Sequence, residues 1–153
     1  MKSLELKVFP PLVAAIFGAA MWGISRVTPV LEVARSYRLY AAIAFVAAGV
    51  SLAIGGAVAF RRARTTVNPM KPESASSLVA SGVYRITRNP MYVGLLLLLI
   101  AWAIFLAAPL ALLGPPAFVL YMNRFQIKPE EAALTKLFGA QYNEYKATVR
   151  RWL

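Results

Sequence analysis

Residues 81–94 read Ser-Gly-Val-Tyr-Arg-Ile-Thr-Arg-Asn-Pro-Met-Tyr-Val-Gly and lead directly into Leu-Leu-Leu-Leu-Leu-Ile at 95–100. The first part mixes polar, aromatic, glycine and proline residues, a composition typical of turns. Asn89-Pro90 is a common helix start, with Asn as the N-cap and Pro as the first helical residue. The stretch therefore predicts a polar loop joined to a helix whose leucine run suits a lipid phase. This is a place where a membrane protein would carry out chemistry.

The composition indicates a single membrane-embedded domain, residues 1–153. Apolar residues make up 59% of the chain and charged residues 15%, against about 45–50% and about 25% in soluble domains. The chain contains no cysteine and no histidine. Disulfides and thiolate metal sites are therefore excluded, no metal is expected, and the usual general base near neutral pH is absent.

Four apolar segments are candidates for membrane spans: 8–25, 39–60, 91–108 and 110–125. Each has about the length needed to cross a bilayer core of roughly 30 Å, or slightly less. The sequence thus predicts an all-α integral membrane protein with about four transmembrane helices, the third and fourth forming a hairpin. Gly114-Pro115-Pro116 predicts an irregular or kinked start of the fourth helix. A cleaved signal peptide, with Lys2 and Lys7 as its basic region, is the alternative interpretation of the first segment.

The C-terminal residues 128–153 form an amphipathic pattern that predicts a cytoplasmic helical segment at the membrane surface or over the loops. Pro129 occupies a plausible first helical position, and Glu130 and Glu131 follow in the first turn, where the helix dipole favours acidic residues. Farther along, aromatic and aliphatic residues recur at spacings that place them on one face of a helix. These residues are Tyr142, Tyr145, Val149 and Trp152.

The net charge of +11 has two interpretations, nucleic-acid binding or the positive-inside bias of membrane proteins. With four spans and both termini cytoplasmic, fourteen Lys and Arg residues lie inside (two before residue 8, six in 61–90 and six from 124 onward) and three outside. The bias favours a multi-pass protein of the cell inner membrane and no nucleic-acid partner. It also places the loop 61–90 and the C-terminal segment on the same, cytoplasmic side.

Each polar feature near these loops has an ordinary explanation. Tyr84 and Tyr92 suit interfacial anchors, and Arg85 and Arg88 suit inside charges. Their combination is more informative, because the helix starts at 89–90 and 129–130 would meet at one membrane face. Free helix amides or an arginine would bind a carboxylate, a glutamate would bind an ammonium, and tyrosines would stack on a purine or face a cation. S-adenosylmethionine carries all of these groups.

The segment Arg88-Asn89-Pro90-Met91-Tyr92-Val93-Gly94, followed by Glu130-Glu131, resembles the Arg-His-Pro-x-Tyr-x-Gly … Glu-Glu signature of the isoprenylcysteine carboxyl methyltransferase family. Phospholipid N-methyltransferases also approximate this signature. The resemblance covers about residues 65–152. It implies a membrane methyltransferase that binds S-adenosylmethionine without a Rossmann domain, with a cofactor-binding core at 61–153 preceded by two spans within 1–60.

Carried over position by position, the resemblance implies a set of cofactor-binding residues and leaves the catalytic residue undefined. Asn89 stands where the best-studied branch of the family has His. Gln126 stands where the prenylcysteine branch uses an Arg near the substrate carboxylate, with Arg124 close enough to substitute, so both are candidate substrate-binding residues. The implied cofactor-binding residues are Ser76, Ser77, Leu78, Val79, Tyr84, Asn89, Pro90, Met91, Tyr92, Glu130 and Glu131.

Three functions remain open from the sequence. The first is S-adenosylmethionine-dependent methyl transfer to a lipophilic, membrane-borne acceptor, through the carboxylate or amine of a lipid-like or prenylated molecule. The second is a nicotinamide-dependent membrane reductase related to sterol reductases. The third is a non-enzymatic four-helix membrane protein such as a small transporter, which is disfavoured because segments 8–25, 39–60 and 91–108 contain no Asp, Glu, Lys or Arg.

Overall fold

The computed structural model describes residues 5–65 and 70–153, and over these ranges it contains helices and turns with no β-strand. The all-α prediction is therefore confirmed for this part of the chain. Lys2, one of the two basic residues of the alternative signal-peptide interpretation, lies outside the described residues.

Two helices within the described ranges are long and apolar enough to cross a membrane, namely α1 (Pro10–Val27) and α2 (Arg35–Arg62). Pro10 and Pro11 occupy the first turn of α1, where a missing backbone N–H costs no intrahelical hydrogen bond. Helix α3 (Pro90–Leu106) is apolar but has 17 residues, which span about 26 Å at 1.5 Å per residue. The third and fourth spans therefore stay predictions.

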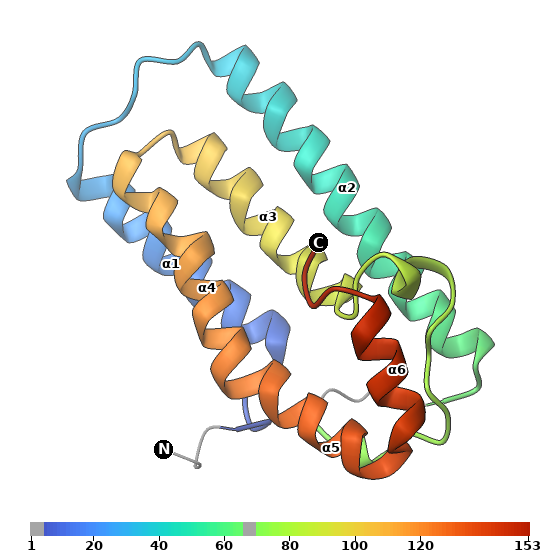
Figure 1. Cartoon of the computed structure of the whole chain (residues 1–153). Helices are drawn as coiled ribbons and strands as arrows, with labels where there is room; N and C mark the ends of the chain where they lie inside the picture. The colour runs from blue at the N-terminus through green and yellow to red at the C-terminus, as the bar shows by residue number, and fades with distance from the viewer. Residues whose placement is uncertain (1–4, 66–69) are drawn as a thin grey trace.

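Helices α2 and α3 pack along their length, as Figure 1 shows. Their backbones approach closely at Gly49 and Gly94. A Cβ added to Gly49 would lie 2.8 Å from the Gly94 carbonyl oxygen, and one added to Gly94 would lie 2.7 Å from the Gly49 carbonyl oxygen. The two glycines thus allow the close crossing of α2 and α3, as expected from small residues at a membrane helix interface.

Helix α3 ends in a left-handed residue, Ala107, with φ 51°. A short 3₁₀ turn over Pro109–Leu113 follows, and α4 (Gly114–Met122) begins at the glycine before Pro115 and Pro116. Both prolines fit there because the first turn of a helix leaves its N–H groups without intrahelical partners. The prediction of an irregular helix start is confirmed.

Helix α4 continues without a break into α5 (Lys128–Phe138) through one π-helical turn at Asn123–Ile127. The Lys128 amide donates to the carbonyl oxygen of Asn123. The prediction that Pro129 and Glu130 begin a new helix with free amides was wrong, because the preceding turns supply the carbonyl oxygens that a true helix start lacks.

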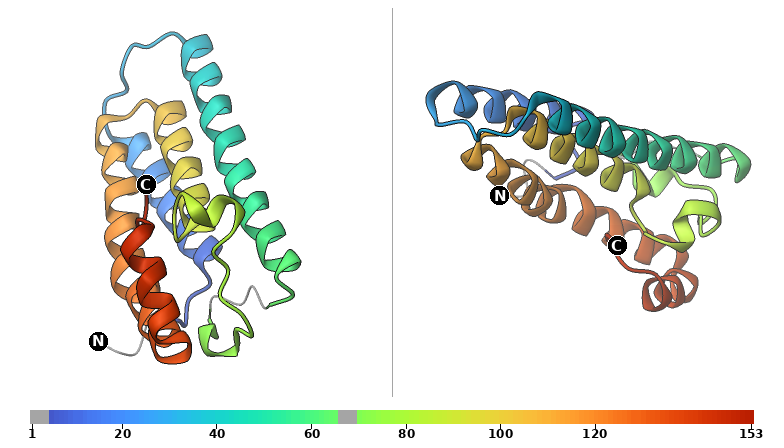
Figure 2. Two further views of the ribbon diagram at one scale, coloured as in Figure 1. Left: turned by 45° about the vertical axis from the view of Figure 1, so that its right-hand side comes forward. Right: turned by 90° about the horizontal axis from the view of Figure 1, so that it is seen from above.

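Gly139, at φ 54°, separates α5 from α6 (Ala140–Thr148). Figure 2 shows that α6 lies on the opposite side of the molecule from α1 and α2. The prediction that Val149 and Trp152 continue one helical face with Tyr142 and Tyr145 was wrong, since α6 ends at Thr148 and Val149 is extended. The reason is that side chains of residues 87–89 bind the carbonyl groups of residues 149–151.

Two hydrophobic clusters result. The larger one packs α1, α3 and α4 together around residues such as Val13, Leu99 and Phe118. The smaller cluster joins the end of α2, the loop before α3, and α5 and α6. Tyr84, Tyr142 and Tyr145 are buried in this second cluster. It therefore fixes the loop and the C-terminal helices against one end of the bundle.

Candidate functional site

A pocket lies at this end of the bundle, where α2 ends, α3 begins and α5 and α6 fold back against the loop. Most of the predicted cofactor-binding residues line it, although they come from four separate parts of the chain. The lining residues are Phe60, Lys71, Pro72, Ala75, Ser77, Leu78, Val79, Tyr84, Arg88, Asn89, Met91, Tyr92, Glu130, Glu131, Leu134, Tyr142 and Tyr145.

Tyr92 and Glu130 connect α3 to α5 inside this pocket. The Tyr92 hydroxyl donates to Glu130 Oε2 at 2.9 Å, and it accepts a hydrogen bond from Gln126 Nε2 at 3.3 Å. Gln126 is only 3% exposed and belongs to the π-helical turn. This turn therefore places the Gln126 amide behind Tyr92, where it supports the tyrosine rather than lining the pocket.

The pKa of Glu130 is raised from 4.5 to about 7, mainly by burial and also by the neighbouring carboxylate of Glu131, whereas the hydrogen bond from Tyr92 acts in the opposite direction. Desolvation disfavours the ionised form of a carboxyl group unless a cation compensates. No ion pair to Glu130 occurs among the described residues. Glu130 is therefore a partly buried carboxyl group that is about half ionised at neutral pH.

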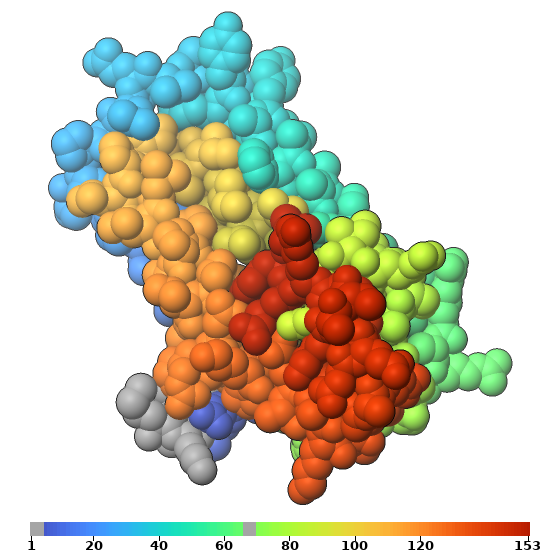
Figure 3. Space-filling view, viewed as in Figure 1, coloured from blue at the N-terminus to red at the C-terminus, as the bar shows by residue number. Residues whose placement is uncertain are grey.

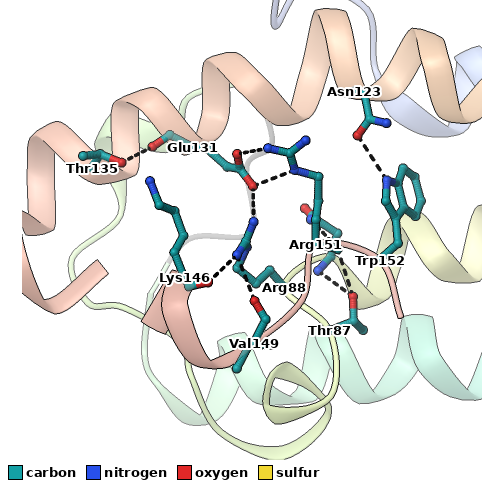
Figure 4. Close-up of polar contacts among 10 residues, drawn as sticks. Thr87, Arg88, Asn123, Glu131, Thr135, Lys146, Val149, Arg151 and Trp152 are labelled. Carbon is teal, nitrogen blue, oxygen red and sulfur yellow. Dashed lines mark hydrogen bonds and ion pairs between the residues drawn. The ribbon is translucent and has the colours of Figure 1, made fainter. Parts of the chain in front are cut away.

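Glu131 has the opposite environment, as the close-up in Figure 4 shows. Its Oε1 accepts hydrogen bonds from Arg88 Nη2 at 2.8 Å and Arg151 Nε at 3.0 Å, and its Oε2 accepts one from Arg151 Nη2 at 2.6 Å. Burial raises the pKa of Glu131, but the bonds from Arg151 and Arg88 outweigh this effect and leave the pKa below 4.5. Glu131 is therefore an ionised, fully paired carboxylate.

Asn89 is 9% exposed and lines the pocket, but its side chain does not cap α3. Asn89 is the N-cap residue and Pro90 the first helical residue, as predicted, although the Asn89 side chain makes no capping hydrogen bond. Instead, Asn89 Nδ2 donates to the Arg151 carbonyl oxygen at 2.8 Å, which draws the side-chain amide toward the C-terminal residues.

Tyr84 supplies an aromatic wall of the pocket and meets Phe60 edge-to-face, with ring centroids 5.4 Å apart. Its backbone carbonyl accepts a hydrogen bond from the Tyr145 hydroxyl at 2.7 Å. Burial raises the pKa of Tyr84 well above the ordinary value, so its phenol stays protonated. Sequence reasoning did not place Phe60, Tyr142 and Tyr145 in the site, although the helical spacing of the two tyrosines was the available signal.

The remaining predicted residues lie around or away from the pocket. The Ser76 amide donates to Thr65 Oγ1 at 2.9 Å, and neither Ser76 nor Pro90 lines the pocket. Arg124 forms an ion pair with Glu5 at 2.7 Å and is also absent from the lining. A substrate-binding role for Arg124 and Gln126 stays a prediction.

Arg88 lines the pocket, although it was not among the predicted cofactor-binding residues. Besides its bond to Glu131, its Nη1 donates to the carbonyl oxygens of Lys146 and Val149. Its Nε is buried and has no hydrogen-bond partner within the described ranges. The pocket therefore combines an unpaired carboxyl group, aromatic rings and one available guanidinium N–H, a set suited to a zwitterionic ligand with an aromatic base.

Most of the residues that line the pocket lie in a part of the chain that matches one protein family. The model of the phospholipid methyltransferase family matches residues 37–141. An uncharacterized protein of Haemophilus influenzae is 51% identical over 63 residues, which are 41% of this chain and all of that protein. No solved structure matches the chain.

Two plant proteins match a longer part of the chain. A probable protein-S-isoprenylcysteine O-methyltransferase of Oryza sativa subsp. indica is 35% identical over 95 residues, 60% of this chain and 48% of that protein. Protein-S-isoprenylcysteine O-methyltransferase A of Arabidopsis thaliana is 36% identical over 80 residues, 50% of this chain and 39% of that protein. The chain thus aligns with half or less of these plant relatives. From the extent of the family match, the chain belongs to the phospholipid methyltransferase family.

Proposed function

We propose that this membrane protein transfers a methyl group from S-adenosylmethionine to a lipophilic acceptor held in the bilayer. The observation that carries the proposal is the pairing of Tyr92 with Glu130 in a pocket that holds a carboxyl group free of any cationic partner among the described residues. The family match and the isoprenylcysteine methyltransferase relatives support the same reaction class.

The residues present fit the proposed cofactor. Glu130 would hold its ammonium group, because a carboxylate without a counterion in a partly buried site gains most from a cationic ligand. The Arg88 Nε–H is available for its carboxylate. Tyr84 and Phe60 provide the aromatic wall for its adenine. The bound cofactor supplies an already activated methyl group on sulfur, so the protein mainly has to align the acceptor and exclude water.

An apolar groove offers a route for the acceptor. It runs between α1 and α3, has a volume of about 500 Å³, and is lined mainly by small and aliphatic residues with a tryptophan on each helix. Leu95, in this lining, is one helical turn beyond Tyr92 and Met91, which line the pocket. Helix α1 lies outside the part of the chain that the family model matches. The lining residues are Pro11, Ala14, Ala15, Gly18, Ala19, Trp22, Leu95, Leu98, Leu99 and Trp102.

The acceptor group determines whether a base is needed. A carboxylate acceptor attacks the methyl carbon without losing a proton, so no base is required. An amine acceptor is an ammonium in water and has to lose one proton before attack. Because Glu130 is assigned to the ammonium group of the cofactor, an amine acceptor would release that proton to water before it enters the site. The proposal includes both acceptor classes.

The proposed topology has four spans, both termini in the cytoplasm of the cell inner membrane, and the pocket on the cytoplasmic side. The charge distribution supports it: fourteen of the seventeen Lys and Arg residues lie in the segments assigned to the inside. Cofactor would then reach the pocket from water, and the acceptor from the bilayer.

The test is transfer of a labelled methyl group from S-adenosylmethionine to a native lipid extract by the purified protein in detergent. The wild type is expected to label a lipid-soluble product, and Glu130→Gln is expected to lower the rate by about tenfold or more, which corresponds to about 1.4 kcal/mol. Absence of labelling together with NADPH binding would contradict the proposal and favour a reductase.

A further inference from the structure

The five C-terminal residues, 149–153, form an extended strap that lies against the turn at residues 87–89. The Arg88 amide donates to the Arg150 carbonyl oxygen at 2.9 Å, and Thr87 and Arg150 form an isolated parallel bridge. The Arg151 carbonyl oxygen accepts bonds from Thr87 Oγ1 at 3.2 Å and Asn89 Nδ2 at 2.8 Å. The strap is therefore bound by the residues that lead directly into α3.

The side chain of Arg151 holds the strap to α5. It forms a two-point contact with Glu131 through Nε and Nη2, the geometry in which an arginine and a carboxylate bind most strongly and most specifically. Arg88 joins the same carboxylate, and its side chain is 11% exposed. A three-residue ion cluster thus connects the strap, the turn before α3 and the start of α5.

Trp152 covers the side of the site away from the pocket. Its Nε1 donates to Asn123 Oδ1 at 3.1 Å in the π-helical turn, and its ring packs against the cluster that contains Tyr92 and Met122. In Figure 3 the C-terminal residues, in dark red, lie between α4 and the loop segment. No strap residue lines the pocket, whereas Arg88, Asn89 and Glu131 do. The strap therefore packs against these three residues from the side that faces away from the pocket.

The ion cluster is adjacent in sequence to the pair that carries the proposed function. Glu131 directly follows Glu130 on α5, and Arg88 precedes Tyr92 by four residues. A shift of α5 away from the start of α3 would lengthen both the Glu131–Arg88 contact and the Tyr92–Glu130 contact. Arg88 alone makes a one-point contact with Glu131, so the two-point contact of Arg151 provides most of the geometric restraint.

We propose that Arg151 and Glu131 are positioning residues that latch the strap against α5 and thereby hold Glu130 within hydrogen-bonding distance of Tyr92. This inference rests on the proposed function and assigns a positioning role, in place of ligand binding, to the second glutamate of the Glu130-Glu131 pair.

The test compares Arg151→Gln with Arg150→Gln in the full-length protein. Both variants lose one positive charge, but the Arg150 side chain is exposed and makes no hydrogen bond or ion pair to Glu131. Two measurements are made on each: hydrogen exchange of residues 84–91 and 145–153, and calorimetric binding of S-adenosylhomocysteine from pH 5.5 to 8.5.

Arg151→Gln is expected to speed exchange in both segments by about tenfold or more and to weaken binding at pH 7.5 by about threefold or more. The pH midpoint of binding should also rise, because a longer hydrogen bond from Tyr92 lowers the pKa of Glu130 less. Glu131, Tyr84 and Gln126 are also polar groups around this pair. Arg151→Lys should restore part of the affinity, and Arg150→Gln should match the wild type in every measurement.

Faster exchange without a change in affinity or pH midpoint would overturn the positioning role, and unchanged exchange would overturn the latch itself. Equal effects of Arg150→Gln and Arg151→Gln would also overturn it, because net charge alone would then be responsible. Failure of the wild type to bind S-adenosylhomocysteine would overturn the proposed function and the positioning role with it. The exchange comparison still decides in that case whether Arg151 latches the strap.

Discussion

The hydroxyl of Tyr92, in the first turn of α3, donates a 2.9 Å hydrogen bond to Glu130 Oε2, in the first turn of α5. This bond joins two segments that are 38 residues apart in sequence. It places a phenol and a carboxyl group together in the lining of the pocket, and the Gln126 amide donates to the same phenol. The predictions below follow from this pair and from the helix packing that supports it.

Replacing Tyr92 by Phe removes the hydroxyl and retains the ring. Because the bond from Tyr92 lowers the pKa of Glu130, its loss should raise that pKa further and reduce the ionised fraction at pH 7. The Gln126 amide also loses an acceptor. We expect a destabilisation of about 1 kcal/mol and weaker S-adenosylhomocysteine binding, measured by denaturation in detergent and by calorimetry. Unchanged stability and affinity would show that the bond has no role.

Binding of a cationic ligand at Glu130 should depend on pH through its pKa of about 7. Only ionised Glu130 attracts the ammonium group, so affinity should rise between pH 6 and pH 8 by about tenfold and then level off. Calorimetric titrations across this range measure the effect. Glu130→Gln should abolish the pH dependence, and a slope that persists in this variant would assign the titration to another group.

The same pKa predicts how stability depends on pH. The folded protein holds the Glu130 proton more tightly than the unfolded chain does, so this contribution to stability is complete below about pH 4.5 and is lost as the pH rises through about 7. Glu130→Gln should therefore gain stability relative to the wild type as the pH increases from 5 to 8. Denaturation of both proteins across this range would reveal a difference of the opposite sign if the carboxyl group is instead stabilised when ionised.

If the groove between α1 and α3 admits the acceptor, a larger side chain should impair acceptor binding only at positions that line the groove. Ala15 lines the groove, whereas Ala20 is exposed on the same helix and does not line it. Ala15→Phe should raise the apparent KM for the lipid acceptor by about tenfold with little change in cofactor affinity, and Ala20→Phe should behave as the wild type. Equal effects of the two substitutions in the labelled-lipid assay would exclude the groove as the acceptor route.

The crossing of α2 and α3 should tolerate no side chain at Gly49. An added Cβ would lie 2.8 Å from the backbone oxygen of Gly94, so Gly49→Val should cost about 1–3 kcal/mol through helix displacement. Gly23 is the matched control, because a Cβ added there meets no atom within 4 Å. Thermal denaturation in detergent distinguishes the variants, and equal melting temperatures would argue against the close crossing.

Local patterns were enough to predict much of this architecture. The apolar lengths and proline positions identified α1 and α2, and the motif at 88–94 identified the start of α3. The resemblance predicted that Tyr92 and Glu130 contribute to one cofactor cleft, because it carried the spacing between two distant motifs, but it did not predict the hydrogen bond between them. Gly114-Pro115-Pro116 correctly indicated an irregular helix start, because its backbone restrictions are local.

The parts that the sequence did not predict depend on contacts between distant segments. Pro129 is compatible with a first helical position, but a π-helical turn continues α4 through it, and no local signal distinguishes the two cases. The spacing of Val149 and Trp152 fits a helix, yet Arg88 and Asn89 bind the backbone there. Tertiary hydrogen bonds overrode periodicity at these positions.

The most direct measurement of the central claim is calorimetric titration of the detergent-solubilised protein with S-adenosylhomocysteine at pH 7.5. Glu144→Gln serves as the control, since Glu144 is exposed on α6 and does not line the pocket. The account predicts saturable binding by the wild type and by Glu144→Gln, and affinity reduced by about tenfold or more in Glu130→Gln, as expected for loss of a charge-assisted hydrogen bond. No binding by the wild type at millimolar ligand, or equal affinity in all three proteins, would contradict it.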